Sequence, residues 1–397
     1  MRQGVIFIVV FFIFSGAKIV LFPEMAKFFY YFSSLFALRF QIKLYFCTTM
    51  MNDEKYMRRC FALAENGIYY AAPNPMVGCV IVKDDTIISE GFHQCCGENH
   101  AERNAILRID DKTALKGSTL YVNLEPCSHY GKTPPCADLI SQYPFERVVV
   151  CNLDPNPLVS GRGIERISKA GIKVTTGVLE KEGRLLNRRF FTFMEKRRPF
   201  VILKWAQTRD GFMDIDRNDD SQKTYWITNQ KLKCEVHKWR TQEAAIMVGT
   251  QTVVNDNPQL TARLWHGNNP VRVAIDRNGR IPSTAYIIDG SCPTIIYTEN
   301  SEMKCSENLQ YVVVNFDNLL DEILTDLWNR KIQSIIVEGG LRLLNTFIEQ
   351  QLWDEARVLI GNKMFGKGLK APSFPFVPNT VEQIDDDFIC LYNAPEL

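Results

Sequence analysis

The sequence predicts an α/β protein with two consecutive domains. A length of 397 residues exceeds what one hydrophobic core usually fills. An apolar content of 46% and a charged content of 23% are ordinary for a globular protein. Strand-like runs alternate with helical patterns in both halves, and the charged segment 180–198 separates the halves. We therefore expect one domain over residues 50–197 and a second over residues 198–397.

The first half predicts helices and strands in alternation. The segments are a helix starting at 53 and stopping near 67, strands over 77–82 and 86–91, a helix over 100–107, strands over 119–124 and 147–151, a helix over 164–169 and a strand over 172–176. Pro126 is expected to open a helical turn after the strand that ends at Leu124. In residues 180–198 we expect one charged helical stretch, whose arginines 184, 188 and 189 form a solvated face rather than an anion site.

The second half predicts a further α/β domain. Its segments are strands over 200–205, 244–248, 270–275, 294–297, 311–314 and 333–337, a turn at 210–211, a helix after 228 and a helix over 319–329. Between residues 337 and 342 the sequence Val-Glu-Gly-Gly-Leu-Arg follows an apolar strand. Two glycines at such a junction allow a backbone to approach a ligand phosphate at a helix N-terminus, although the pair alone is a weak signal.

Charge and cysteine usage exclude several classes of function. The formal net charge is +1, and residues 1–49 contribute five basic residues against one acidic residue, a net of +4. Residues 50–397 therefore carry −3, which disfavours a polyanionic partner such as a nucleic acid. Twelve cysteines in a chain of this length do not indicate a disulfide framework, so we expect a cytoplasmic protein.

The N-terminal 49 residues resemble a signal peptide in pattern. Arg2, an apolar run over 5–14 and small residues at 15–17 imitate its three parts, but Lys18 interrupts the apolar stretch. Membrane targeting is one interpretation. We expect instead that translation starts at Met50 or Met51 and that residues 1–49 are not part of the working protein, with no membrane association of residues 50–397.

A candidate zinc site is the strongest chemical signal. His100, Cys127 and Cys136 are a nitrogen and two sulfur donors that suit zinc, and three protein ligands leave one position open for water. Glu102 is placed to move protons in a hydrolytic deamination, in which zinc lowers the pKa of bound water to about 7. The nine-residue spacing of the cysteines departs from the usual Pro-Cys-x-x-Cys, and His129 is a weaker competing ligand.

Several longer motifs carry a family resemblance. They are Pro-Asn-Pro-Met-Val-Gly-Cys at 73–79, Cys-Ser-His-Tyr-Gly-Lys-Thr-Pro-Pro-Cys at 127–136, Asp-Pro-Asn-Pro at 154–157 and Gly-Arg-Gly at 161–163. From about Asp53 almost to the C-terminus, the chain resembles the bifunctional deaminase/reductase of riboflavin biosynthesis. The resemblance implies a cytidine-deaminase-like α/β/α domain at the N-terminus and a dihydrofolate-reductase-like α/β domain at the C-terminus.

The resemblance also implies substrate contacts in the first domain. These would come from Asn74, His93, Lys132 and Asp154. Amide and carboxylate groups can hydrogen-bond the edge of a diaminopyrimidinone, and a lysine can pair with a ribose phosphate. Taken alone, each of these residues would be interpreted as structural.

In the second domain the resemblance implies an NADPH site and a substrate site. It rests on the motifs at 204–211, 226–228 and 252–263 together with the Gly-Gly pair. The cofactor residues would be Gln207, Trp226, Thr252, Asp256, Gly340, Leu341, Arg342, Leu343, Leu344, Asn345 and Thr346. The substrate residues would be Lys204, Thr224, Arg240, Leu260, Arg263 and Glu338. The guanidinium groups of Arg240 and Arg263 suit a phosphate.

The implied function is two consecutive steps of riboflavin biosynthesis. The first domain would deaminate 2,5-diamino-6-(5-phosphoribosylamino)pyrimidin-4-one, and the second would reduce the ribosyl chain of the product with NADPH. We expect a small phosphorylated pyrimidine as the substrate and a homo-oligomer as the assembly. One alternative is a zinc deaminase that acts on a tRNA base, which would need a basic, aromatic surface. Another is a non-catalytic zinc module, which would normally have four protein ligands.

Overall fold

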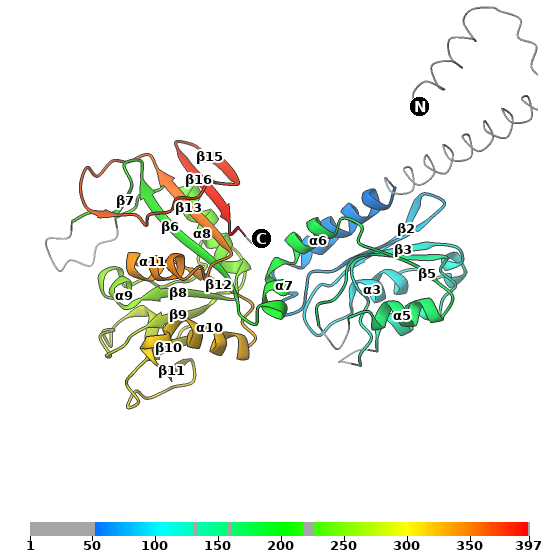
Figure 1. Cartoon of the computed structure of the whole chain (residues 1–397), viewed down its shortest axis with the longest axis horizontal. Helices are drawn as coiled ribbons and strands as arrows, with labels where there is room; N and C mark the ends of the chain where they lie inside the picture. The colour runs from blue at the N-terminus through cyan, green and yellow to red at the C-terminus, as the bar shows by residue number, and fades with distance from the viewer. Residues whose placement is uncertain (1–51, 131–133, 157–159, 217–224, 396–397) are drawn as a thin grey trace, which may run out of the picture. The chain divides into compact units, whose positions relative to one another are not determined.

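The computed structural model describes residues 52–130, 134–156, 160–216 and 225–395. These residues form two large sheets, one before α6 (Glu180–Leu186) and one after α7 (Arg188–Glu195) (Figure 1). Within the described ranges, no helix has the length and apolar character needed to span a bilayer. The expectations for residues 1–49, for Lys132 and for Thr224 fall outside the described residues.

The first sheet has five strands in the order β2-β1-β3-β4-β5. The strands are β1 Gly78–Lys83, β2 Thr86–Phe92, β3 Thr119–Leu124, β4 Arg147–Asn152 and β5 Lys173–Thr176. Pairing is antiparallel from β2 through β1 to β3 and parallel from β3 through β4 to β5. All five strands expected from the sequence are therefore present, each within two residues of its predicted ends.

Helices cover both faces of this sheet. On one face lie α3 (Ala101–Leu107), α4 (Cys136–Ser141) and α5 (Arg162–Lys169), with short 3-10 turns at Glu65–Gly67 and Lys112–Leu115 elsewhere in the domain. Ile140 of α4 and Ile167 of α5 belong to the core on that face, together with Leu120 of β3. On the other face, Met57 and Cys60 belong to a separate core. The expected α/β/α layering is confirmed.

Of two local predictions in this half, one is confirmed with an added break and the other is wrong. The stretch 180–198 is helical, but it forms two helices, α6 (Glu180–Leu186) and α7 (Arg188–Glu195), which meet at Asn187. The side chain of Asn187 contacts the backbone of Met76. Its Oδ1 accepts a hydrogen bond from Met76 N and its Nδ2 donates to Met76 O, both at 2.9 Å. Pro126 opens no helical turn, since residues 125–128 have no regular secondary structure; Glu125 N donates to Asn152 O at 2.9 Å.

The second sheet has nine strands in the order β11-β10-β9-β8-β12-β6-β13-β16-β15. The strands are β6 Phe200–Thr208, β8 Ala245–Gly249, β9 Val271–Ile275, β10 Thr294–Thr298, β11 Leu309–Val313, β12 Ser334–Val337, β13 Glu355–Gly361, β15 Thr380–Ile384 and β16 Asp387–Asn393. Pairing is parallel from β11 to β13 and antiparallel through β16 and β15. A separate pair joins β7 (Phe212–Asp214) and β14 (Leu369–Lys370).

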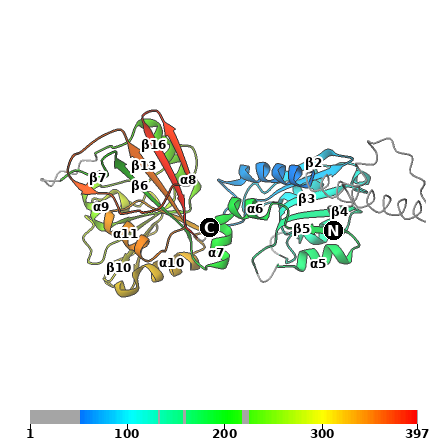
Figure 2. The ribbon, with the colours of Figure 1, turned by 45° about the horizontal axis from the view of Figure 1, so that its top comes forward.

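Helices again lie on both faces of the second sheet (Figure 2). They are α8 Gln230–Gln242, α9 Thr250–Asp256, α10 Leu319–Asn329 and α11 Leu341–Glu349, with 3-10 turns at Tyr286–Ile288 and Phe316–Asn318. Leu324 of α10 and Phe347 of α11 pack into one core, whereas Leu232 of α8 and Val253 of α9 pack into the other. The predicted second α/β domain is confirmed, and β13, β15 and β16 extend it beyond the predicted strands.

The interpretation of the arginines near α7 as a solvated face needs correction. Arg188 donates to Glu355 at 3.0 Å, and Arg189 Nε donates to Glu243 at 2.7 Å. The side chains of both carboxylates are less than one-tenth exposed, so these are buried ion pairs. Only Arg184, which pairs with Glu195, lies on an exposed face. The acidic partners are distant in sequence, which is why local charge patterning missed them.

Candidate active sites

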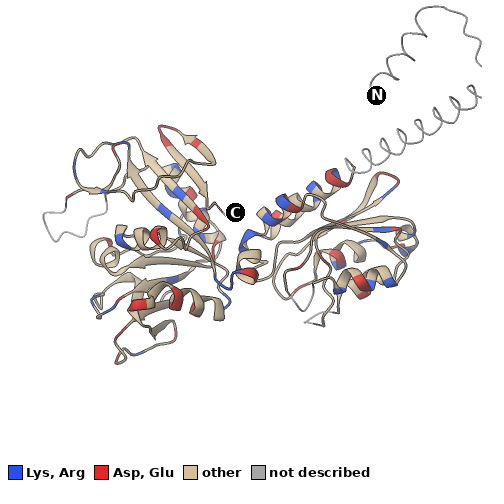
Figure 3. Cartoon of the chain, viewed as in Figure 1, with Lys and Arg blue, Asp and Glu red and all other residues tan. Residues whose placement is uncertain are grey.

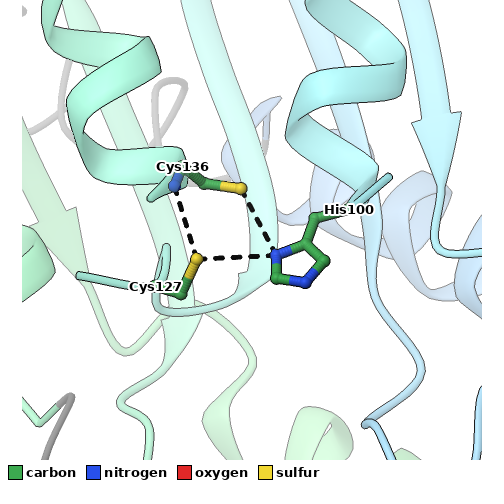
Figure 4. A group of neighbouring side chains, drawn as sticks. All are labelled: His100, Cys127 and Cys136. Atoms are coloured by element: carbon green, nitrogen blue, oxygen red, sulfur yellow. Dashed lines mark hydrogen bonds between the residues drawn. The ribbon is translucent and has the colours of Figure 1, made fainter. Parts of the chain in front are cut away.

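Three separate segments converge on the predicted metal ligands. His100 is the residue directly before α3, Cys127 lies in the loop after β3, and Cys136 is the first residue of α4. His100 Nδ1 lies 3.5 Å from the Sγ of Cys127 and 3.4 Å from the Sγ of Cys136 (Figure 4). All three ligand atoms are within 4.8 Å of one another. The structure therefore brings together residues that span 36 positions of the chain.

A tetrahedral zinc ion fits this set of atoms. Zinc bonds of about 2.1 Å to nitrogen and about 2.3 Å to sulfur place neighbouring ligand atoms about 3.6 Å apart. The hydrogen bond from the thiol of Cys136 lowers the pKa of Cys127, which favours the thiolate that a metal requires. Among the described residues, the third member of the ligand group beside His100 and Cys127 is Cys136. His129, the weaker candidate for that ligand position, lines the neighbouring cavity.

Glu102 lies beside the metal ligands, in the first turn of α3. This helix packs closely against β2 at Gly91. A Cβ at Gly91 would lie only 2.5 Å from Ala101 O. Glu102 is 3% exposed, and burial raises the pKa of its carboxyl to about 7. A carboxyl with a pKa near neutrality can both accept and donate a proton at that pH.

A cavity of about 360 Å³ adjoins the metal ligands. Its lining includes Glu102 and three of the predicted substrate residues, Asn74, His93 and Asp154. His93 Nδ1 donates to the backbone carbonyl of Asn99 at 3.1 Å, which leaves Nε2 to accept from Asn74 Nδ2 at 3.0 Å. Burial lowers the pKa of His93 and raises that of Asp154 to about 6. The lining of the cavity therefore includes a neutral imidazole, an amide and a carboxyl group.

A second cluster of charged residues lies in the nine-stranded domain. Arg240 of α8 donates to both carboxylate oxygens of Glu338, at 2.8 and 3.2 Å, and Lys204 Nζ of β6 lies 3.7 Å from the same carboxylate. Burial alone would raise the pKa of Glu338, but Arg240 and Lys204 lower it to about 2. The third donor of Arg240 binds Thr261 O at 3.0 Å. Glu338 thus contacts two other predicted substrate residues, Arg240 and Lys204.

The expected cofactor loop follows β12 next to this cluster. Gly339 has φ +100°, a conformation that favours glycine, and its carbonyl accepts from Gly249 N at 2.9 Å. A Cβ at Gly340 would lie 3.3 Å from Thr252 Oγ1, so the loop passes close to α9. Both α9 and α11 begin without a side-chain cap, after the neighbouring strands β8 and β12. Free amides of two helix N-termini at one sheet edge suit the phosphates of NADPH.

The other predicted reductase residues differ in accessibility. Leu260, Leu343 and Leu344 are buried, and their side chains belong to the two hydrophobic cores of this domain. Trp226 is 51% exposed, and Lys233 Nζ lies 3.6 Å from the centre of its ring. Gln207 accepts a hydrogen bond from Trp205 Nε1 at 2.8 Å.

The remaining predicted reductase residues contact Thr261 or lie within α9 and α11. Arg263 and Arg240 both contact Thr261, with Arg263 Nη1 3.5 Å from its Oγ1. Asp256 is the last residue of α9. Four predicted cofactor residues lie within α11 outside its core-facing leucines: Leu341, Arg342, Asn345 and Thr346.

Comparison with known proteins matches each half of the chain. Residues 50–152 match the cytidine and deoxycytidylate deaminase zinc-binding region, and residues 199–383 match the RibD C-terminal domain. The riboflavin biosynthesis protein RibD of Aquifex aeolicus is 40% identical over 323 residues, which cover 80% of this chain and 89% of that protein. RibD of Escherichia coli is 36% identical, with 80% and 89% covered.

The chain belongs to the RibD family of riboflavin biosynthesis proteins. A crystal structure from Thermotoga maritima, described as a diaminohydroxyphosphoribosylaminopyrimidine deaminase/5-amino-6-(5-phosphoribosylamino)uracil reductase, matches with a TM-score of 0.78. It is 39% identical, and the match covers 87% of this chain and 99% of that one. Acinetobacter baumannii RibD also has a TM-score of 0.78, at 32% identity and with 86% and 98% covered.

Membership of the RibD family establishes the bifunctional deaminase/reductase character expected from the sequence. Zinc in the deaminase domain and NADPH in the reductase domain are its cofactors. RibD enzymes act on small phosphorylated pyrimidines. The resemblance of the sequence to this family and the predicted fold class of both domains are confirmed.

Sequence reasoning missed some residues of the RibD deaminase cavity. Phe190 and Met194 of α7 line it, although their segment was interpreted only as a connection between domains. The apolar run Phe-Phe-Thr-Phe-Met at 190–194, inside a charged segment, is the signal that indicates burial. Glu125 also lines the cavity, and its position directly before Pro126 and Cys127 marks it as part of the ligand segment.

Proposed function

We propose that residues 50–197 deaminate 2,5-diamino-6-(5-phosphoribosylamino)pyrimidin-4-one and that residues 198–397 reduce the ribosyl chain of the product. The observation that carries the first step is the buried carboxyl of Glu102 in one cavity with His100 and Cys127. The boundary at residues 197 and 198 is supported by the two family matches, which end at 152 and begin at 199.

In the deaminase step, Glu102 moves the protons. Zinc held by His100, Cys127 and Cys136 would supply a Lewis acid and an activated water at neutral pH. Water adds to the ring carbon that bears the exocyclic amine, and Glu102 carries a proton from that water to the leaving nitrogen. The products are ammonia and a ring carbonyl, so atoms and charge balance. The raised pKa of Glu102 suits a group that takes and returns a proton within one cycle.

The cavity wall would hold the pyrimidine. Asn74 offers both a donor and an acceptor, and Asp154 offers acceptors or, when protonated, one donor. His93 anchors Asn74 through their 3.0 Å contact, so it acts on substrate orientation through that amide as well as directly. Lys132 is proposed as the partner of the ribose phosphate.

In the reductase step, the charged cluster would orient the sugar chain. Residues at the start of α11 would hold NADPH, whose chemistry would supply the hydride for C1′ of a ring-opened, imine-like form of the substrate, while the imine nitrogen would take its proton from water. Arg240 and Lys204 are held by Glu338, which keeps both cations in place before the substrate arrives. Arg263, which shares Thr261 with Arg240, has guanidinium donors suited to the phosphate.

The alternative function, deamination of a nucleic-acid base, accounts for fewer features of the structure. Along α6, for example, Lys181 and Arg184 alternate with Glu180 and Glu182, a mixed pattern that Figure 3 shows on other helices as well. Such surfaces lack the single-sign field that draws a polyanion. That function also leaves the nine-stranded domain without a role.

We also propose a cytoplasmic homo-oligomer. The cysteines that the structure describes form no disulfides, in keeping with a reducing compartment. Val381 on β15, the edge strand of the second sheet, is 56% exposed, and apolar edge positions favour association. Light scattering coupled to size exclusion would test the assembly, and a monomer at micromolar concentration would contradict it.

The test of the proposed reactions uses the full chain loaded with zinc. With the diaminopyrimidine nucleotide alone we expect ammonia release, and with NADPH added we expect stoichiometric NADPH oxidation after deamination. Ammonia release without any NADPH oxidation would limit the proposal to the first domain. Absence of both signals from folded, zinc-loaded protein would overturn it.

A further inference from the structure

We propose that Glu125 is a positioning residue of the deaminase site, whose carboxylate holds Asp154 and the backbone at Gly161–Ile164 against the metal-ligand loop and so places Asp154 for substrate binding. This inference rests on the proposed role of Asp154 in binding the pyrimidine. It assigns to Glu125 a task separate from metal binding and from proton transfer.

The contacts of the Glu125 carboxylate are with backbone amides of one downstream segment. Its Oε2 accepts from Gly161 N at 3.0 Å and from Asp154 N at 3.3 Å. Its Oε1 accepts from Gly163 N at 3.1 Å and from Ile164 N at 3.5 Å. A single side chain therefore ties together the start of the loop at Asp154 and the first turn of α5.

These contacts compensate a buried charge. Glu125 is 3% exposed, and an ionised carboxylate in such a place needs hydrogen-bond donors to replace its water. The amides at the start of α5 point free N–H groups toward it, and charge-assisted hydrogen bonds of this kind are stronger than neutral ones. Because every donor is a backbone group, the position of the segment depends directly on where this carboxylate lies.

The segment is also in close steric contact with the metal-ligand loop. A Cβ built at Gly163 would lie 2.0 Å from Pro126 O, so only glycine allows the start of α5 to approach the residue before Cys127. Glu125 N donates to Asn152 O at 2.9 Å, which joins the ends of β3 and β4. Glu125 thus connects three parts of the site: the loop that bears Cys127, the end of β4 and the start of α5.

Asp154 is the residue on which this arrangement acts. Its backbone N–H is held by Glu125, and its side-chain Oδ1 accepts from Asn156 N at 2.8 Å. Both constraints orient a carboxyl group that lines the cavity beside Glu102. Loss of the Glu125 contacts should therefore weaken substrate binding through Asp154 and leave the metal ligands in place.

The test compares Glu125→Gln with Glu146→Gln in the full, zinc-loaded chain. Gln keeps the shape of Glu125 but replaces one acceptor by an NH2 group that opposes backbone N–H donors. We expect the KM for the diaminopyrimidine nucleotide to rise about tenfold or more, with zinc content and reductase activity unchanged. Glu146, an exposed residue of the same domain, serves as the matched control and should leave KM unchanged.

Two further measurements separate positioning from general stabilisation. Hydrogen exchange of the backbone amides of Asp154, Gly161, Gly163 and Ile164 should accelerate in Glu125→Gln. In addition, the KM effect should be non-additive with Asp154→Asn, because both changes remove the same substrate contact. Multiplicative effects of the two changes, or an unchanged KM in Glu125→Gln, would overturn the inference.

A shorter carboxylate keeps the proposal testable if Glu125→Gln fails to fold. Glu125→Asp retains the charge but withdraws it by one methylene, so we expect a smaller rise in KM than about tenfold and partial acceleration of exchange. A folded Glu125→Asp protein with the wild-type KM and exchange rates would overturn the inference. Failure of the proposed deamination itself would look different, since the wild-type chain would then release no ammonia.

Discussion

The guanidinium of Arg240 donates one hydrogen bond to each carboxylate oxygen of Glu338, at 3.2 and 2.8 Å. The two residues are 98 positions apart, one on α8 and one directly after β12. Their side chains are about one-tenth exposed. The pair, with Lys204 beside it, forms a preorganised charged group in the reductase domain before any substrate is bound.

Replacing Glu338 by Gln should both destabilise the reductase domain and impair its activity. Arg240 and Lys204 would remain buried without their anion, and breaking a buried pair costs about 3 kcal/mol or more. We expect a lower denaturant midpoint for that domain, reductase activity reduced by about 100-fold, and unchanged ammonia release. The control is Glu349→Gln, an exposed residue of α11. Wild-type stability in Glu338→Gln would show that the pair is not structurally important.

Acid should weaken the reductase domain through the same carboxylate. The folded-state pKa of Glu338 is about 2, below its ordinary value of 4.5, so the folded state binds fewer protons than the unfolded state between these values. The stabilisation is fully present above pH 4.5 and is lost as the pH falls toward 2, by an amount on the order of 3 kcal/mol. The denaturant midpoint should decrease less between pH 6 and pH 3.5 in Glu338→Gln than in wild type. An equal decrease in the two proteins would show that Glu338 is not the carboxylate responsible.

Glu102→Gln should abolish deamination selectively. The amide cannot carry a proton, and positioned general acid–base catalysis typically contributes about 100- to 10,000-fold. We expect zinc content, measured by elemental analysis, and NADPH oxidation with the deaminated substrate to match wild type. Glu98→Gln, which changes another acidic residue of the same cavity, provides the comparison. Normal ammonia release from Glu102→Gln would remove Glu102 from the mechanism.

Removal of zinc should separate the two activities. His100, Cys127 and Cys136 belong to the five-stranded domain, whereas the expected NADPH loop follows β12 of the nine-stranded sheet. Treatment with a strong chelator should eliminate ammonia release and leave NADPH oxidation with the uracil substrate intact, and added zinc should restore the first activity. A parallel loss of both activities would indicate that the metal also supports the second domain.

Much of the architecture could be predicted because it depends on local patterns. All five strands of the first sheet and α10 of the second domain follow from apolar periodicity that each segment carries by itself. Sequence reasoning missed strands β13, β15 and β16, of which β13 is buried. β15 is mostly exposed, so it lacks the continuous apolar run that marks the buried parallel strands.

The metal site was predictable in composition but not in geometry. His100, Cys127 and Cys136 are the residue types that zinc selects, and their motif is readable in the chain. Their mutual distances depend on how α3, α4 and the loop after β3 pack. Helix packing likewise decides the burial of Leu343 and Leu344, because the orientation of α11 turns both side chains into the core.

By itself, the sequence determined the two-domain α/β organisation, the family and the chemical types of both sites, because periodicity and motif residues are local properties. Only the tertiary structure decided which charges are buried and with whom they pair. Arg189 meets Glu243 and Arg188 meets Glu355, 54 and 167 positions away, and Glu125 meets four amides that begin 29 positions downstream. A buried charge needs an oppositely charged or hydrogen-bonding group nearby, and here those groups come from distant parts of the sequence.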